Sequence, residues 1–420
     1  SGLLPVAILL ALFLGVGIPL HGRVALPAIV PFLAALGVAF LQCRHRPFPE
    51  RLNVVARAMG QTDVMVMCLV FLLAGAFAGA AEAAGCVTST VNFGLSVLPA
   101  WATVAGLFVI ASFASTAMGT SVGTITAIAP IAVGIAEATG MGAPLCLGAV
   151  VCGAMFGDNL SIISDTTIAA TRTQGCDMRA KFRENLRLVL PAALLTVALF
   201  VAVAPGGGVP AGAHPFSVPL LLPYLAVLVT ALCGMNVVLV LALGTLLSLG
   251  VGIGLGELPA AEAFRAVGDG VAKMYDITAI SLVVAGVLGL VRENGGIDWL
   301  LRHVLRRVRG RRGAQAGIAV LVSAVDVATA NNTVAIVMAG PVVRDVAQRH
   351  GVSPARAASI VDIYASVWQG LLPYGAQLLA AAAAASVTPA ALLPWLFYPI
   401  LMGLTVPLVL LIRTSVRRKP

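Results

Sequence analysis

The sequence predicts an all-α polytopic membrane protein made of two inverted-topology repeats. Of its 420 residues, 60% are hydrophobic and only 10% are charged, and the mean hydropathy is +1.01. Soluble domains carry about 25% charged residues. Apolar stretches of about 17 residues or more, the length that a helix needs to cross a bilayer, recur along the whole chain. The 44 glycines and 24 prolines fit helices that pack closely and are broken in places.

A spacing of 211 residues relates the two halves of the chain without a gap. Glu82 and Glu293 end the same apolar span in the two halves, a position typical of an interface or a helix cap. Further pairs at that spacing are Ala74-Gly75 with Ala285-Gly286, Gly85 with Gly296, Pro130 with Pro341, and Gly140 with Gly351. The sequence therefore predicts a first repeat over residues 1–204 and a second over residues 212–420.

Equivalent segments of the two repeats carry different charges. The segment before the third span is basic in repeat one and nearly balanced in repeat two, and the segment after that span is uncharged in repeat one and basic in repeat two. The basic residues are Arg44, Arg46, Arg51 and Arg57 in the first copy, and Arg302, Arg306, Arg307, Arg309, Arg311 and Arg312 in the second. Because basic loops stay on the cytoplasmic side, the copies are predicted to cross the membrane in opposite directions, with both chain ends inside.

Repeat one is expected to hold its segments in a fixed order. Apolar spans at 3–20, 24–42 and 64–84 precede a short segment at 88–98 that lies flat; a span at 101–116, irregular segments at 120–138 and 142–170, and a span at 188–203 follow. Repeat two has the same order. The first span lacks the basic leader and cleavage site of a signal peptide, so it is expected to belong to the structure. Without the flat segment, seven crossings per copy result, and short or polar segments could be re-entrant instead.

The stretch from Gly157 to Thr167 is the most informative part of the chain. It holds two carboxylates and five other polar side chains, inside a run from Gly142 to Ala170 that has no other charged residue. Ionisable groups at membrane depth usually pair, bind an ion or line a watery cavity. We therefore expect Asp158 and Asp165 to bind Na⁺ or carry a proton, since hard oxygen ligands suit these ions. On a continuous helix Ser161 would lie near the same face; alternatively, Asp165 caps a half-helix.

A second polar stretch, residues 115–124, lies between two apolar segments. Its glycines and hydroxyls would loosen a helix and free backbone carbonyls that could coordinate Na⁺, although a small-residue packing face is the alternative. Asn331 and Asn332 of repeat two fall on Thr120 and Ser121, so two broken helices are predicted to meet there. The equivalent stretch of repeat two supplies candidates for a substrate site or a second half-site. Its polar residues are Asp326, Thr329, Asn331, Asn332 and Thr333.

The repeat-two counterpart of the aspartate stretch has no carboxylate. Gln369 falls on Asp158 and Ala376 on Asp165, so one half is predicted to be specialised for the cation. The other half, with Trp368, Gln369, Tyr374 and Gln377, either contacts a substrate or only supports the fold. Asp362 lies just before it and is either functional or a buried carboxylate bonded to a neighbouring hydroxyl.

These residues together resemble the NhaC-type Na⁺/H⁺ antiporter family, of the wider ion-transporter superfamily. The resemblance rests on G-T-S-V-G-T-I-T-A-I-A-P-I-A-V-G-I-A (119–136), on F-G-D-N-L-S-I-I-S-D-T-T (156–167), and on residues 330–333 and 341–345. It implies Na⁺/H⁺ exchange by a transport domain that slides against a scaffold, as in an elevator. It also implies a cation role for Asp158, Asn159, Ser161, Ser164, Asp165 and Thr166. Ile162, where many members have Pro, and Leu372-Pro373-Tyr374 depart from the family pattern.

The predicted function is a secondary active transporter of the bacterial inner membrane, working by alternating access as a homodimer in the lipid bilayer. Na⁺ and H⁺ would be its coupling ions, with no other cofactor, and a Na⁺- or H⁺-coupled carrier of an amino acid or carboxylate is the alternative. The net charge of +9 fits cytoplasmic loops rather than nucleic-acid binding. The seven cysteines form no CxxC pair, and no HExxH motif is present, so an enzyme is not expected.

Overall fold

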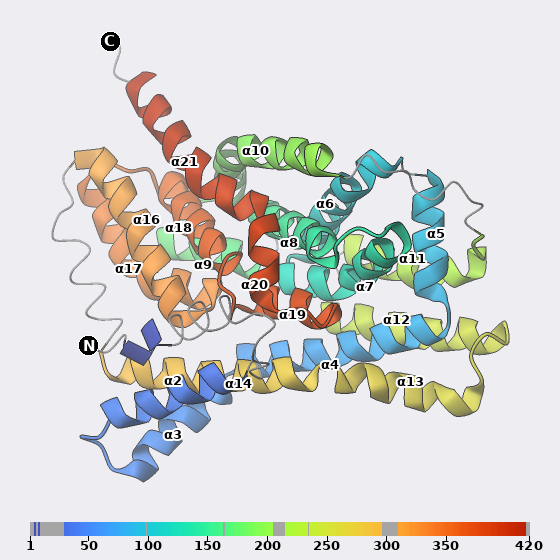
Figure 1. Ribbon diagram of the computed structural model, residues 1–420. Coiled ribbons are helices and arrows are strands. Elements are labelled where there is room, and N and C mark those ends of the chain that lie inside the picture. Colours follow the sequence, from blue (N-terminus) through green and yellow to red (C-terminus); the bar gives the residue numbers. More distant parts are fainter. Residues whose placement is uncertain are drawn as a thin grey trace.

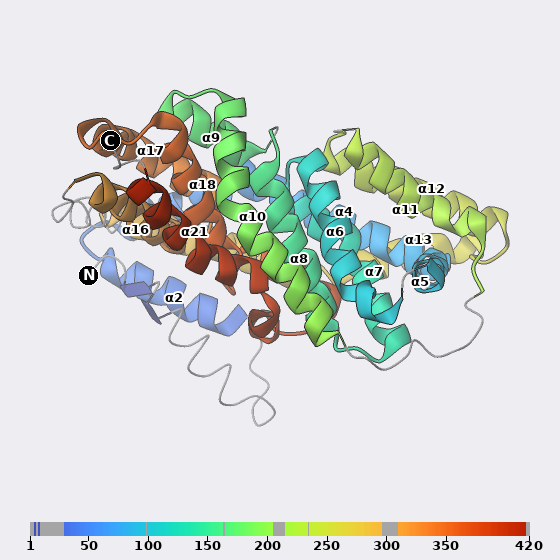
Figure 2. The ribbon, with the colours of Figure 1, turned by 90° about the horizontal axis from the view of Figure 1, so that it is seen from above.

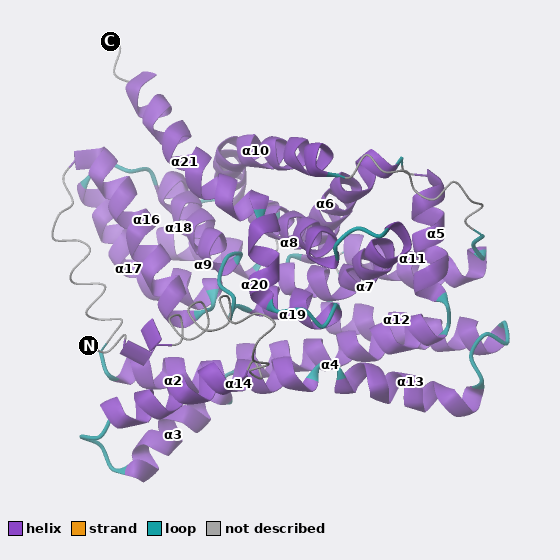
Figure 3. Ribbon diagram, in the orientation of Figure 1, coloured by secondary structure: helices purple, strands orange, loops and turns teal. Residues whose placement is uncertain are grey.

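The computed structural model describes residues 4–5, 7–8, 29–97, 99–162, 164–204, 215–233, 235–295 and 310–416. All regular secondary structure in these ranges is helical (Figure 3). Seven described segments are long and apolar enough to cross a membrane, or up to eight if a helix pair bent by 95° counts as one span. The chain is therefore a multi-pass α-helical membrane protein, as its composition predicts.

The described helices follow one another along the chain as α2 (Ile29–Gln42), α3 (Phe48–Met59), α4 (Thr62–Ala83), α5 (Cys86–Val97), α6 (Ala100–Met118), α7 (Ser121–Thr139), α8 (Ala143–Leu160), α9 (Asp165–Gln174), α10 (Met178–Val203), α11 (Val218–Leu232), α12 (Val237–Gly254), α13 (Ala260–Ala272), α14 (Tyr275–Glu293), α16 (Gly310–Thr329), α17 (Asn332–Arg349), α18 (Pro354–Gln369), α19 (Ala376–Ala384), α20 (Pro389–Leu392) and α21 (Phe397–Val416). Most of the predicted span 3–20 and of the arginine segment 302–312 lies outside the described residues. The predicted flat segment corresponds to α5, which runs across the direction of α4 and α12 (Figure 1).

Many helices of the first half have a counterpart 211 residues later. The pairs α6 and α16, α7 and α17, α8 and α18, and α9 and α19 begin and end within two residues of that spacing. The helix breaks are equivalent too: one follows α6 and α8 in the first half, and one follows α16 and α18 in the second. The broken helices that the glycine and polar stretches predict are therefore present in both halves.

Two long helical rods run side by side in opposite directions (Figure 1). One rod is α3 with α4, and the other is α13 with α14. Val55 lies close to Gly286 near one end, and Gly79 lies close to Ala266 near the other. Residue numbers thus rise along one rod as they fall along the other, so the equivalent helices α4 and α14 have opposite orientations, as inversion predicts.

Close backbone packing and exposed ion pairs join these rods. A Cβ on Gly270 would lie 2.1 Å from the Gly75 carbonyl oxygen, which only glycine permits at this crossing. Glu82, near the end of α4, lies 3.2 Å from Lys273 Nζ at the junction of α13 and α14, and Glu293, at the end of α14, lies 2.9 Å from Arg46 just before α3. The two equivalent glutamates therefore mark contacts between the halves, one of the two roles expected from their repetition.

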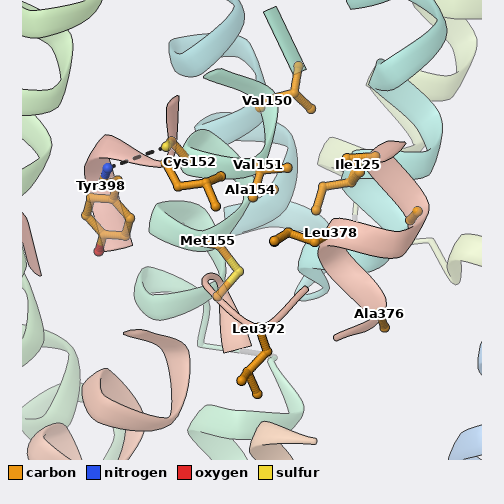
Figure 4. Close-up of a cluster of buried hydrophobic side chains, with 14 of the residues drawn as sticks. Ile125, Val150, Val151, Cys152, Ala154, Met155, Leu372, Ala376, Leu378 and Tyr398 are labelled. Carbon is orange, nitrogen blue, oxygen red and sulfur yellow. Dashed lines mark hydrogen bonds between the residues drawn. The ribbon is translucent and has the colours of Figure 1, made fainter. Parts of the chain in front are cut away.

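A separate bundle of broken helices surrounds an apolar core. Figure 4 shows part of this core, with side chains from α7 and α8 against others from α19 and α21. Its labelled members are Ile125, Val150, Val151, Cys152, Ala154, Met155, Leu372, Ala376, Leu378 and Tyr398. The Tyr398 backbone N–H donates to Cys152 Sγ at 3.4 Å. Both halves thus build one core, and this core holds the helix breaks in place.

Candidate functional site

Four helix breaks form the polar centre of the bundle. The α6–α7 break turns at Gly119, with φ of 69°, and Thr120 caps α7 by accepting from the Gly123 N–H at 3.3 Å. In the equivalent α16–α17 break, Asn331 accepts from the Val334 N–H at 2.9 Å. The α8–α9 and α18–α19 breaks span residues 161–164 and 370–375. At the α6–α7 and α16–α17 breaks, these caps mark where one helical hydrogen-bond ladder stops and the next begins.

Ala330 is strained at the α16–α17 break, and its replacement gives a stability prediction. It has φ of 47°, in the left-handed region, where its equivalent in repeat one is Gly119. A side chain with a Cβ costs about 1–2 kcal/mol there. Ala330→Gly should therefore raise the stability of the purified protein by about 1 kcal/mol, measured by thermal unfolding in detergent. A lower unfolding midpoint for the variant would show that the Ala330 methyl packs more than it strains.

One cavity of about 870 Å³ lies where the four breaks meet α4, α12 and α14. The residues that the sequence predicted and that line this cavity are Thr120, Ser121, Asp158, Ser164, Asp165, Thr166, Thr329, Asn331, Asn332, Thr333, Gln369, Tyr374 and Gln377. Both repeats therefore contribute to it. The facing of the two polar stretches, 115–124 and 326–333, agrees with the expectation that paired breaks meet.

Asp158 is the buried carboxylate of this cavity, with 4% of its surface exposed. Ser164 Oγ donates to Asp158 Oδ1 at 2.5 Å, and Ser121 Oγ donates to Asp158 Oδ2 at 3.0 Å. Ser164 Oγ also lies 2.9 Å from Thr166 Oγ1. The two serines come from different breaks, so the carboxylate joins α7, α8 and α9. A hydroxyl can donate to a carboxylate or turn its oxygen toward a cation, so this arrangement suits both ions.

A chain of hydrogen bonds continues from Asp158 into repeat two. Gln377 Nε2 donates to Ser121 Oγ at 3.1 Å, and Gln369 Nε2 donates to Gln377 Oε1 at 2.8 Å. Gln369 Nε2 also lies 3.3 Å from the Ala330 carbonyl oxygen. All four breaks are therefore tied to the environment of one carboxylate, and a change at Asp158 reaches the α16–α17 break through side-chain contacts.

The helix N-termini that follow the four breaks all line the cavity. They belong to α7, α9, α17 and α19. Ser164 and Gly375, which precede α9 and α19, make no side-chain cap, so first-turn N–H groups there lack the usual cap. Asp165 is the first residue of α9 and is exposed, unlike Asp158. Helix N-termini carry partial positive charge, so the cavity wall favours an anionic group at these points.

The sequence profile of the Na⁺/H⁺ antiporter family matches residues 5–204 and 216–412. The chain belongs to the Na⁺/H⁺ antiporter family. The match extends through both halves, and it confirms the resemblance read from residues 119–136 and 156–167. Membership of a family of antiporters agrees with the expectation of a transporter rather than an enzyme.

Relatives of this family member are named as antiporters of different solutes. A segment of 144 residues is 33% identical to the malate-2H⁺/Na⁺-lactate antiporter of Bacillus subtilis, and covers 34% of this chain and 31% of that protein. A segment of 120 residues is 37% identical to the Na⁺/H⁺ antiporter NhaC of Alkalihalophilus pseudofirmus, and covers 28% and 26%. These matches thus span about a third or less of either relative. The arginine/ornithine antiporter ArcD of Halobacterium salinarum is 23% identical over 97% of this chain and 90% of its own.

Several predicted residues lie outside the cavity of this family member. Asn159 points its amide toward Tyr398, with Nδ2 3.1 Å from the phenol oxygen. Ser161 is buried, and its hydroxyl has no hydrogen-bond partner within the described chain. Trp368 is 38% exposed and does not line the cavity. Asp326 is 0% exposed, and neither carboxylate oxygen has a hydrogen-bond partner among the described residues, so it needs a proton or a cation.

Asp362 forms a buried ion pair that sequence reasoning missed. Its Oδ2 lies 2.8 Å from Lys181 Nζ, and the two side chains are 0% and 1% exposed. Asn185 Nδ2 donates to the same oxygen at 2.7 Å. In the sequence Lys181 stands among the basic residues Arg179, Arg183 and Arg187, just before the apolar span at 188–203. Its spacing to Asn185, Leu188 and Ala192, all on the buried face of α10, was the signal that could have identified it.

The described side chains do not form a conventional multi-ligand metal centre. In the part of the chain that the structure describes, no three His, Cys, Asp or Glu side chains gather closely enough to hold a metal ion. A cation at this site would instead have Asp158 as its charged ligand and hydroxyl oxygens around it. Such a ligand set suits a monovalent ion that binds and leaves.

Proposed function

We propose that this family member exchanges Na⁺ for H⁺ across the membrane, and that both ions compete for Asp158. One observation carries the proposal. Asp158 is a buried carboxylate at the edge of the shared cavity, and hydroxyls from two separate helix breaks, Ser121 and Ser164, bind its two oxygens. A carboxylate in such a place is costly unless a proton or a cation neutralises it.

Competition for one carboxylate would couple the two ions. When Na⁺ binds, Asp158 contributes the negative charge, and the hydroxyls of Ser121 and Ser164 can turn their oxygens toward the ion. When a proton binds instead, the neutral acid donates a hydrogen bond and leaves no charge for Na⁺. Asp158 is neutral when it holds Na⁺ or a proton, and only these neutral forms of the site cross the low-dielectric barrier at low cost. A site with neither ion bound stays charged and therefore remains on one side of the membrane.

We further propose an elevator-like movement for alternating access. The cavity lies between the broken-helix bundle and the long helices α4, α12 and α14, so the boundary between a moving part and a scaffold would pass through it. The recurrence of helices at the spacing of 211 residues and the opposite directions of α4 and α14 support repeats at 1–204 and 212–420. Inverted repeats give two states of similar energy that open to opposite sides.

Proteoliposomes with a trapped pH-sensitive dye test the exchange directly. With Na⁺ inside and none outside, outward Na⁺ flow should draw protons in and acidify the lumen. Choline in place of Na⁺ should leave the lumen unchanged, because it cannot fit between a carboxylate and two hydroxyls. Equal pH changes with Na⁺ and choline, or none with either, would refute Na⁺/H⁺ exchange.

A Na⁺- or H⁺-coupled carrier of a small organic solute is the second candidate. The cavity volume of about 870 Å³ is far larger than a bare Na⁺ requires and falls in the range of small-molecule sites. The N-termini of α9, α17 and α19 could hold a carboxylate, and relatives are named for malate, lactate, arginine and ornithine. A screen of carboxylates and amino acids by thermal shift, with and without Na⁺, decides: Na⁺-dependent stabilisation by a solute favours this candidate, and no stabilisation argues against it.

The cellular setting proposed here is the bacterial inner membrane, with both termini in the cytoplasm and two copies forming a homodimer. The basic segment at Arg44, Arg46, Arg51 and Arg57 supports the orientation. Cysteine labelling of intact cells tests the termini, and cross-linking in membranes tests the assembly.

A further inference from the structure

Lys181 is held like a bound ion, away from the cavity. Its ammonium lies 2.8 Å from Asp362 Oδ2, and it donates to Thr167 Oγ1 at 2.6 Å and to the Asn159 carbonyl oxygen at 3.3 Å. An ammonium has three donors and no acceptor, so these three oxygens satisfy it. Lys181 is 1% exposed and does not line the cavity.

The oxygens around Lys181 are of the kinds that bind hard cations. They are a carboxylate, a hydroxyl and a backbone carbonyl, and they come from α18, α9 and α8. The cluster has more acceptors than donors. Two further buried oxygens on the side chains of this cluster, Asn185 Oδ1 and Asp362 Oδ1, have no hydrogen-bond partner among the described residues. A cluster that only had to satisfy a lysine would not need this surplus.

The helix geometry adds to the attraction. Asn159 lies in the last turn of α8, where carbonyl oxygens have no intrahelical partner and carry partial negative charge. Asn185 Nδ2 donates to the same Asn159 carbonyl oxygen at 2.9 Å. Helices α9, α10 and α18 pack against one another around this point (Figure 2).

The same helix break serves Asp158 and Lys181. Ser164, just before α9, donates to Asp158, and Thr167, three residues later, accepts from Lys181. Asp158 and Asn159 are neighbours at the end of α8, one contributing its carboxylate to the cavity and the other its carbonyl to Lys181. The α8–α9 break therefore has cation-binding groups in two directions.

We propose that the oxygens of Asn159, Thr167 and Asp362 form a second monovalent-cation site, which the Lys181 ammonium occupies permanently in place of a free ion such as Na⁺. Lys181 neutralises Asp362 without exchanging with the solution. The inference about stoichiometry rests on the proposed function: with this site closed, Asp158 exchanges one Na⁺ for one H⁺, and the exchange moves no net charge.

Removing the Lys181 ammonium tests the second site through Na⁺ binding alone, without a transport measurement. In the Asp158→Asn protein the cavity site has lost its charge, so Na⁺ should barely change the thermal unfolding midpoint relative to choline. In the Asp158→Asn/Lys181→Ala protein, Na⁺ should raise the midpoint by several degrees, because the vacated oxygens accept the ion. Equal responses of the two proteins to Na⁺ would overturn the second site.

A matched control and a measurement on the unaltered protein complete the test. Lys273→Ala removes an exposed ion-pair partner, 57% exposed beside Glu82, and should add no Na⁺ response in the same background. If the Lys181 variant does not fold, wild-type proteoliposomes still decide: exchange that does not respond to an imposed membrane potential agrees with one Na⁺ for one H⁺, and a potential-dependent rate overturns it. Failure of the proposed function differs, since Na⁺ would then drive no proton movement at all.

Discussion

Asp158→Asn should abolish Na⁺-driven proton movement in proteoliposomes. The asparagine amide keeps the shape of the side chain and can still bond the hydroxyls of Ser121 and Ser164, so the fold should survive. It can neither carry the negative charge that Na⁺ needs nor exchange a proton. Losing a charged ligand of this kind costs about 3 kcal/mol, roughly a hundredfold in Na⁺ affinity.

Asp165→Asn is the matched control for this experiment. Asp165 lies seven residues later and also lines the cavity, but it is exposed at the first turn of α9. Its neutralisation should change the exchange rate only a few-fold, since exposed charges near a helix N-terminus contribute about 1 kcal/mol or less. Full activity of Asp158→Asn, or complete loss in Asp165→Asn with Asp158 intact, would move the exchanging carboxylate from Asp158 to Asp165.

Lys181→Met should have the largest effect on stability. Methionine keeps much of the apolar stem but leaves Asp362 as a buried charge without its cation. Breaking a buried ion pair from one side costs about 3–5 kcal/mol. We expect little folded protein in membranes, measured by fluorescence-detected size exclusion of a fusion, and a much lower unfolding midpoint for what is recovered.

Two further variants separate charge from packing at this pair. Adding Asp362→Asn to Lys181→Met removes the unpaired charge, so folded protein should recover to a large extent. Lys273→Met breaks the exposed pair with Glu82 and should cost about 1 kcal/mol or less. No recovery in the double variant would mean that the ammonium acts through its contacts with Thr167 and Asn159 rather than by neutralising Asp362.

Much of this fold could be predicted from the sequence because helix breaks have local causes. Gly119 adopts a left-handed backbone, and Thr120 and Asn331 are good N-cap residues, so each polar stretch marks a helix end. The spacing of 211 residues placed equivalent breaks in both halves. Inversion also predicts that the breaks of the two halves lie close together, since breaks at the same depth in two oppositely oriented copies can meet.

The contacts within the site could not be predicted in the same way. The expectation that Ser161 shares a face with Asp158 and Asp165 needed a continuous helix, but α8 ends at Leu160 and α9 begins at Asp165. Which neighbour faces the cavity then depends on the tertiary packing, so Asp158 points inward and Asn159 toward Tyr398. The burial of Lys181 could not be predicted from its charge, because a lysine near a loop usually lies at the surface. Only its position in the helical register of α10 places it inside.

Calorimetric titration of the wild-type protein with Na⁺ at a series of pH values tests the central claim most directly. Competition for Asp158 means that each bound Na⁺ displaces one proton, so lowering the pH should weaken binding. In the acidic range the apparent affinity should fall about tenfold for each pH unit, and it should level off at alkaline pH. A Na⁺ affinity that stays constant across the whole range in which the protein is folded would contradict a carboxylate shared by the two ions.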